Sequence, residues 1–210
     1  MKESMKLPTA RGSRKRVATR DSDATQARIL EAAKTLFSQN TYEGVGVREI
    51  ASNADVDPAL VIRYFGSKEK LFRLVVSQAF SASELLQRGP QALPANAAQL
   101  LTGELDEKQW RSGYDPLRLL LCSIGSATAG PIVSEYLRDS FIVPIAEALP
   151  GKHGNERAVL LAGSIVGFAL VRIALASVDG YTLKQRPLKE LLTGTLASLI
   201  GSDAKDSAVD

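Results

Sequence analysis

The chain is poor in the side chains that most often bind metals or act as catalytic nucleophiles and bases. Its 210 residues include one cysteine, Cys122, and one histidine, His153. A single cysteine excludes an intrachain disulfide and a cysteine-based metal cluster, and it fits a reducing compartment such as the cytoplasm. His153 lies in a predicted loop with no second histidine and no acidic cluster nearby. We therefore expect no metal site and no cofactor.

The sequence patterns that define common enzyme classes are missing as well. The chain has no Ser-His-Asp set, no glycine-rich phosphate loop after a strand, and no metal-ligand spacing. We predict that the protein is not an enzyme.

No uncharged apolar segment is long enough to cross a bilayer. The segment 158–171 comes nearest, but its 14 residues end at Arg172, and a spanning helix needs about 20. We predict a buried or interface helix there instead. No apolar segment follows Met1 closely, so we expect no secretory signal. These features predict a cytoplasmic protein with no membrane partner.

The remaining composition is that of a soluble helical protein. Hydrophobic residues make up 45% of the chain and charged residues 23%, as in ordinary globular proteins. No segment alternates polar and apolar residues over the length of a strand, whereas several repeat apolar residues at helical spacing. The sequence predicts an all-α protein with room for two domains.

Positive charge is concentrated at the N-terminus. Residues 1–20 have a net charge of +6, although the whole chain has +3. Such a segment can bind nucleic-acid phosphates, or it can be a solubilising tail. Residues 1–22 have few apolar side chains and no period, so we predict a disordered basic arm. The first helix is expected over 23–39, where Asp23 and Gln26 resemble a capping box.

The segment 46–71 predicts two short helices joined by a tight turn. Apolar residues repeat at helical spacing until Ala54, where the pattern breaks. Asp55 can take the left-handed conformation that a tight turn needs. Asp57 is a favourable N-cap, and Pro58 is a favourable first residue for a second helix. This is the outline of a helix-turn-helix DNA-binding motif, although any helical hairpin of a globular protein would share it.

An ordered set of residues surrounds this motif: Ile29, Leu30, Ala33, Leu36, Phe37, Tyr42, Gly44, Val47, Ile50, Ala51, Val56, Tyr64, Phe65, Ser67, Lys68 and Leu71. Over about residues 25–80 this set resembles the N-terminal domain of the TetR family of transcriptional repressors. The chain departs from the family at Gly46, where threonine is usual, and at Asp55, where glycine is usual. The resemblance implies an N-terminal three-helix DNA-binding domain and a larger C-terminal helical domain for ligand binding and dimerisation.

The second helix of the motif is predicted to read DNA. Val61 and Phe65 are expected to face inward. Leu60 and Ile62 can then contact thymine methyl groups, and Arg63 can donate two hydrogen bonds to guanine, although it can also be a solvated surface charge. The resemblance implies phosphate contacts at the start of the next helix. The predicted DNA-binding residues are Gly46, Arg48, Pro58, Ala59, Leu60, Ile62, Arg63, Tyr64 and Lys68.

The domain organisation follows from where the helical patterns stop. A long helix over 67–86 is expected to tie the DNA-binding domain, residues 23–88, to the second domain, residues 89–201. Residues 202–210 are predicted to form a polar tail.

The second domain is expected to hold a small-molecule ligand. Pro144 should kink the helix predicted over 131–149, and a kink between helices can open a cavity. The helices are rich in leucine, isoleucine, valine and alanine, so a mostly apolar ligand is expected. The candidate cavity residues are Trp110, Cys122, Phe141 and Phe168, each of which can also be plain core.

Two strongly apolar helices end the chain. The resemblance implies that the last two helices of each subunit form a four-helix interface in a homodimer, whereas the alternative is that both are consumed by the core of one subunit. The predicted interface residues are Gly163, Gly167, Leu188, Leu192 and Leu196.

These expectations combine into one function. We predict a homodimeric transcriptional regulator that binds a palindromic operator in double-stranded DNA. It is expected to act as a repressor that a small, mostly apolar effector releases. The alternative is a DNA-binding dimer with no ligand, acting as a constitutive or architectural regulator. The second domain argues against that alternative because it is larger than dimerisation alone requires.

Overall fold

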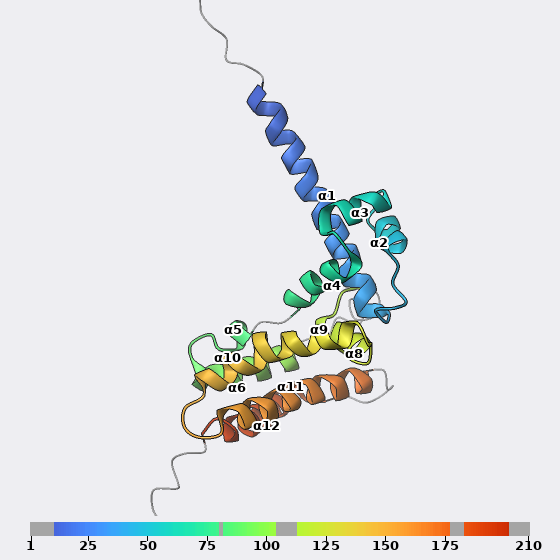
Figure 1. The fold of residues 1–210 in the computed structure, drawn as a ribbon. Helices are drawn as coiled ribbons and strands as arrows, with labels where there is room; N and C mark the ends of the chain where they lie inside the picture. Colours follow the sequence, from blue (N-terminus) through green and yellow to red (C-terminus); the bar gives the residue numbers. More distant parts are fainter. Residues whose placement is uncertain (1–10, 80–81, 104–112, 177–182, 202–210) are drawn as a thin grey trace, which may run out of the picture.

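The computed structural model describes residues 11–79, 82–103, 113–176 and 183–201. Within these ranges every regular element is a helix, which confirms the predicted all-α fold (Figure 1). The helices are α1 (Arg11–Gln39), α2 (Val47–Asn53), α3 (Pro58–Phe65), α4 (Lys68–Ser77), α5 (Ala82–Leu85), the 3-10 turn η1 (Pro90–Ala92), α6 (Leu93–Thr102), α8 (Pro116–Ser123), α9 (Ala129–Tyr136), the π-helical turn η2 (Leu137–Ile142), α10 (Val143–Ala148), α11 (Gly154–Ala176) and α12 (Gln185–Ser198).

The helices α1 to α4 pack around a first core that contains three aromatic rings. Phe37, Tyr42 and Phe72 are buried, and their ring centroids lie 5.0 to 5.8 Å apart. Ring pairs at these separations stabilise a core beyond the area that they bury. Ile29 and Ala33 from α1 are buried in the same core, as the helical spacing predicted.

A second core lies between α5, α6, η2, α10, α11 and α12, and it is mostly aliphatic. In Figure 1 the helices α9 to α12 lie below the helix-turn-helix domain, with the start of α1 projecting away from them. Leu161 on α11 and Leu196 on α12 have no exposed surface and anchor these two helices to the same core.

The boundary between the two cores differs from the domain boundary expected at Arg88. The helices α8 and α9 contribute Leu120 and Val133 to the first core. The second core begins with Ala82 on α5. Packing therefore passes from one core to the other between Ala79 and Ala82, and part of the C-terminal sequence completes the core of the DNA-binding domain.

The predicted start of the first helix is wrong. The helix α1 begins at Arg11, so the disordered arm expected over 1–22 does not extend past that residue, and residues 1–10 lie outside the described ranges. Asp23 lies inside the helix and is not its N-cap. The lysine, arginine and alanine residues upstream favour helix, and extending a helix costs less free energy than starting one.

The predicted end of the connecting helix is also wrong. The helix α4 stops at Ser77 instead of continuing to Leu86. The N–H of Gln78 donates to the carbonyl of Val75, and the N–H of Ala79 donates to the carbonyl of Val76. A straight helix would keep its apolar side on the first core. The break after Ser77 lets α5 present its own apolar residues to the second core.

The distortion predicted for Pro144 is present as the π-helical turn η2, which directly precedes α10. Proline has no N–H to donate, and its ring would clash with the carbonyl one turn earlier in a regular helix. A widened turn before the proline accommodates both effects. Phe141 lies within this turn and is buried in the second core.

Candidate nucleic-acid interface and ligand cavity

The helices α2 and α3 meet at a tight turn. Asp55 has a φ of 51°, the left-handed conformation predicted for it. The next residue, Val56, donates its N–H to the carbonyl of Ala51 at 3.0 Å. Ala54 is buried beside them. The turn is thus held by hydrogen bonds and packing, which fix the angle between α2 and α3.

Both ends of α3 are specified by local residues. Asp57 accepts the N–H of Ala59 at 2.7 Å, and Pro58 occupies the first turn, as predicted. Gly66 ends the helix with a φ of 80°, where any other residue would be strained. Ser67 then caps α4 by accepting the N–H of Lys70 at 3.1 Å, which is the cap expected from the sequence.

The helix α3 turns Val61 and Phe65 inward and leaves four of its eight residues exposed. Val61 is buried, and Phe65 packs half-buried against the first core, which confirms the inward pair. Ile62 is 46% exposed. Arg63 is exposed and has no hydrogen-bond or ion-pair partner in the described part of the chain. Of the other predicted DNA-binding residues of this helix, Pro58 and Ala59 are exposed and Leu60 and Tyr64 are half-buried.

The start of α2 lies at the protein surface. Gly46 is the N-cap and is exposed, and its N–H reaches the carboxylate of Glu49 at 3.4 Å. Arg48 follows and is exposed as well. Glycine supplies no hydroxyl, so this helix start offers a phosphate the guanidinium of Arg48 and main-chain groups only.

Lys68 does not project outward, as a phosphate contact by its side chain would require. Its ammonium donates to the carbonyls of Tyr42 at 2.7 Å and Val45 at 2.8 Å. It also lies 4.1 Å from the centroid of the Tyr42 ring, a cation–π contact. Burial lowers the pKa of Lys68, and the negative charge of Glu43 opposes that shift. The ammonium of Lys68 therefore fixes the loop before α2.

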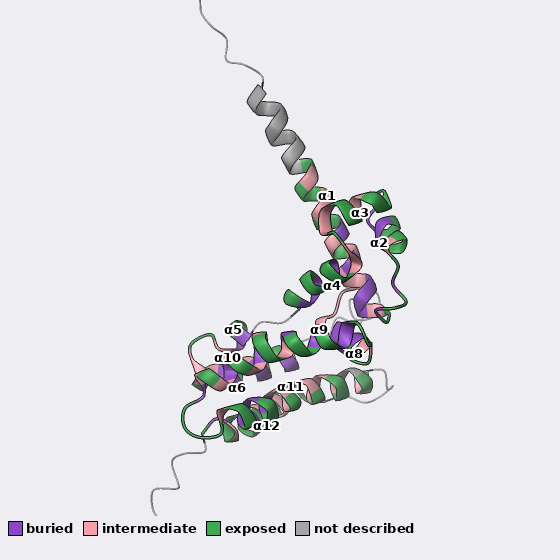
Figure 2. Cartoon of the chain, in the orientation of Figure 1, coloured by how far each residue is buried: buried purple, intermediate pink, exposed green. Residues whose placement is uncertain are grey.

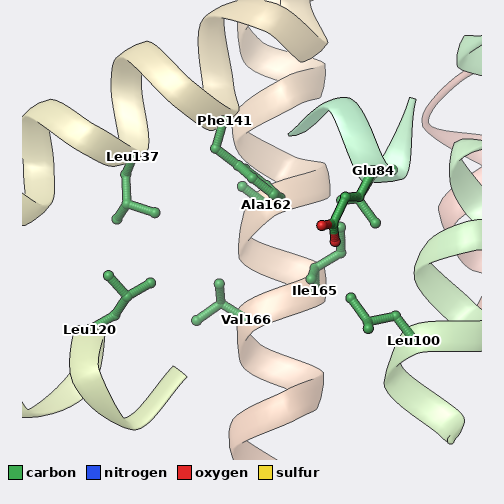
Figure 3. A pocket seen from close by; sticks show the side chains of 9 residues that line it. Glu84, Leu100, Leu120, Leu137, Phe141, Ala162, Ile165 and Val166 are labelled. Atoms are coloured by element: carbon green, nitrogen blue, oxygen red, sulfur yellow. The ribbon is translucent and has the colours of Figure 1, made fainter. Parts of the chain in front are cut away.

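A cavity of about 50 Å³ opens among the helices of the second domain (Figure 3). Its lining is apolar except for one carboxylate. The lining residues are Glu84, Leu85, Leu100, Leu120, Leu137, Phe141, Ala162, Ile165 and Val166. Pockets for drug-sized ligands measure roughly 300–1,000 Å³, so a ligand of that size must widen this cavity.

The four predicted cavity residues lie in different places. Phe141 lines the cavity, as expected. Phe168 packs against the second core without reaching the lining. Cys122 is on the opposite side of α8, where its thiol donates to the carbonyl of Ser38 on α1 at 3.7 Å. Trp110 lies outside the described residues. The leucines of the lining were missed because helical spacing does not show which apolar side chain borders an empty space.

The cavity directly adjoins the DNA-binding domain. Leu120 and Leu137 line the cavity and also pack in or against the first core. Two polar contacts also join the DNA-binding domain to α9 and to the loop before it. Arg73 on α4 pairs with Glu135 on α9 at 3.0 Å. Ser126 donates to Glu43 at 2.5 Å, and this hydrogen bond lowers the pKa of that carboxyl.

The predicted dimer-interface residues divide into two groups. Gly163 and Gly167 are exposed on α11, and Leu188 is half-buried. Leu192 and Leu196 were predicted wrongly, because both are buried in the second core of their own protomer. The large apolar side chains that α11 and α12 expose, among the residues with described burial, are Val159, Leu160, Leu170, Val171 and Leu191. Figure 2 shows exposed segments in green along both helices.

The exposed side of α11 is the face opposite its buried one. Val159, Gly163, Gly167 and Leu170 recur at spacings of three and four residues, whereas Leu161 and Ile165 point into the core. Because both faces of the helix are apolar, Gly154–Arg172 is long and apolar enough to cross a membrane by length and composition alone. Within its most apolar part, 28% of the residues are buried in the protomer. An apolar face of this length on a folded domain marks a contact surface.

A short, capped helix that follows α2 after a tight turn, carried on the domain of α1 to α4 with further helices packed against it, has the architecture of a helix-turn-helix DNA-binding regulator. Two family models match the chain: "Bacterial regulatory proteins, tetR family" over residues 29–75, and "Tetracyclin repressor-like, C-terminal domain" over residues 97–203. The chain therefore belongs to the TetR family of transcriptional regulators.

Curated relatives agree over part of their length. The chain is 34% identical over 120 residues to the probable HTH-type transcriptional regulator YttP of Bacillus subtilis, a match that covers 54% of this chain and 58% of that one. It is 38% identical over 103 residues to the HTH-type regulatory protein RaaS of Mycobacterium tuberculosis, covering 49% and 46%. The matches thus span about half the length of these relatives.

Solved structures share the fold over most of the chain. NalD of Pseudomonas aeruginosa, the secondary repressor of the MexAB-OprM multidrug efflux pump, superimposes with a TM-score of 0.64 at 19% identity, covering 88% of this chain and 99% of that one. A regulator from Aquifex aeolicus gives a TM-score of 0.55 at 22% identity, with 83% and 99% covered. At these identities the likeness concerns the fold alone.

Proposed function

We propose that the protein is a cytoplasmic, homodimeric repressor that holds a palindromic or near-palindromic operator with α3 and leaves it when a small molecule enters the second domain. The observation that carries this proposal is the outward side of α3. Ile62 and Arg63 are exposed there, while Val61 anchors the helix beneath them. That arrangement presents one apolar and one cationic side chain to a major groove.

The proposed contacts divide into reading and positioning. Arg63 donates to guanine and Ile62 packs on a thymine methyl group, which together give sequence preference. Arg48 and Tyr64 bind phosphates and set the register. Lys68 contributes indirectly, because its ammonium donates to two carbonyls of the loop before α2 and so positions that helix.

The apolar outer face of α11 and α12 supports a dimer. Leu191 is 71% exposed on α12, and Gly163 and Gly167 lack the side chains that would keep a second helix away. In the proposed dimer, a two-fold axis through this face is oriented so that both copies of α3 lie on one side of the assembly, which requires an operator with matching half-sites. The same face would otherwise expose to water a strip of apolar surface.

Release is proposed to start at the two leucines that border both the cavity and the first core. A ligand that widens the cavity must displace Leu120 or Leu137, and these side chains support the helices beneath the reading head. The ligand shifts the equilibrium only if it binds the released form better than the DNA-bound form.

The test of this proposal measures which DNA sequences the protein selects and how many protomers bind each duplex. A library of random duplexes is selected on the protein, and the bound sequences are aligned. Two inverted half-sites about one helical turn apart, with two protomers per duplex, are expected. A single asymmetric site, or no enriched sequence, would contradict it. Enriched half-sites that no ligand releases would favour the constitutive regulator.

A further inference from the structure

The cavity of the second domain has a single charged group in its lining. Glu84 on α5 contributes a carboxylate, and the other eight lining residues are aliphatic or aromatic. In the described part of the chain, Glu84 has neither an ion-pair nor a hydrogen-bond partner. A negative charge without a partner beside an apolar space attracts a positive group and repels a negative one.

The lining residues are also arranged by polarity. In Figure 3, Glu84 and Leu100 lie on one side of the cavity, and Leu120 and Leu137 lie on the other. Glu84 and Leu100 are exposed, whereas Leu120 is buried. The cavity therefore has a solvent-facing end with a carboxylate and an inner end made of hydrocarbon.

We propose that the effector of this protein is an elongated amphiphilic cation, which deepens the regulatory function proposed above and rests on it. Its positive group lies at Glu84, where it keeps part of its hydration. Its apolar body enters between η2 and α11. A body long enough to reach Leu120 and Leu137 meets the two side chains that also support the DNA-binding domain.

Charge selectivity follows from this geometry. Pairing with Glu84 compensates the cation for the water that it loses, whereas a carboxylate ligand of the same length meets repulsion at the mouth. A partly solvated pair contributes modestly, so the apolar contacts supply most of the affinity and the carboxylate supplies the preference for positive charge. A neutral ligand gains the apolar contacts alone.

The experiment compares two probes that share a chain length. Decyltrimethylammonium and decanoate are titrated separately into the full-length protein by isothermal calorimetry, below the concentrations at which they form micelles. The cation is expected to bind about five times more tightly than the anion. Glu84→Gln should remove this preference, and Glu84→Lys should reverse it. Glu147→Gln, an exposed glutamate outside the lining, is the matched control and should change nothing.

Three outcomes would overturn the inference: equal affinity of the native protein for both probes, a preference that Glu84→Gln leaves intact, or no binding of the cation. Thermal unfolding of each variant checks that the fold persists. DNA binding is measured on the same samples. A protein that prefers the cation but binds no DNA would contradict the proposed function, and one that binds DNA but shows no preference between the two probes would contradict this inference alone.

Discussion

The two cores of the molecule are filled differently. The first core packs the rings of Phe37, Tyr42 and Phe72 against one another, with centroids 5.0 to 5.8 Å apart. The second is mostly aliphatic, and a cavity opens beside it. Interlocked rings resist rearrangement, whereas aliphatic side chains around an empty space can repack at low cost. This difference fits the proposed function, in which the DNA-binding domain stays rigid while the second domain deforms around a ligand.

The largest effect is expected from breaking the aromatic core. Phe72→Ala removes a fully buried ring that contacts both other rings. It should lower the free energy of unfolding by about 3–5 kcal/mol, as measured by urea denaturation. Leu100→Ala, at a 58% exposed position of the cavity wall, is the control and should cost far less. Similar costs at both positions would show that the ring cluster contributes no more to stability than an exposed leucine of the cavity wall.

The second-largest effect is expected on the base preference conferred by Arg63 on α3. Arg63→Ala should reduce the preference for one base pair by about 1–3 kcal/mol if the guanidinium binds guanine with two hydrogen bonds. Anisotropy on the selected operator and its single-base variants measures this. Arg186→Ala, an exposed arginine on α12, should leave the preference unchanged. Equal loss on operator and random DNA would show that Arg63 contacts phosphate.

A substitution of Lys68 tests whether its ammonium stabilises the fold or contacts DNA. Lys68→Met keeps the stem and removes the ammonium from the carbonyls of Tyr42 and Val45. We expect a loss of about 1–3 kcal/mol in unfolding free energy, because two carbonyls lose a charged donor. The salt dependence of DNA binding should stay the same, whereas Arg48→Ala should lower its slope by about 1. A reduced salt dependence of DNA binding for Lys68→Met would show that the Lys68 ammonium contacts a DNA phosphate.

The smallest expected change in stability comes from filling the cavity. Ala162→Leu adds a side chain where α11 borders the empty space. It should raise the free energy of unfolding by about 0.5–2 kcal/mol and weaken the response of DNA binding to decyltrimethylammonium. Urea denaturation and anisotropy measure the two effects. A destabilised protein would indicate that the wall cannot adjust, and an unchanged response would place the sensor elsewhere.

The features that were predictable from sequence depend on short-range chemistry. Asp57 before Pro58 specifies the start of α3, Asp55 tolerates the turn, and Ser67 caps α4, so each is recognisable from a few neighbouring residues. Val61 was predicted to face inward because helical spacing carries that information. The resemblance of this region to the TetR family was confirmed by the family models.

The features that were not predictable depend on distant partners. An apolar stripe does not identify what it packs against, so Leu192 and Leu196 were assigned to a dimer although they complete the protomer's own core. The inward turn of Lys68 depends on carbonyls more than twenty residues earlier in the chain. The position of Glu84 beside the cavity was not predictable, because a single exposed glutamate forms no sequence pattern that indicates a neighbouring cavity.

The proposed function requires that α3 binds a specific operator as part of a dimer. Fluorescence anisotropy on DNA from immediately upstream of the gene, at physiological salt and with excess random competitor, tests it most directly, because affinity without a stated salt concentration has little meaning. We expect tight, competitor-resistant binding with two protomers per site, and Arg63→Ala should weaken it by about 1–3 kcal/mol. Binding that random DNA removes, together with a monomeric protein and no sequence enriched from a random library, would contradict it.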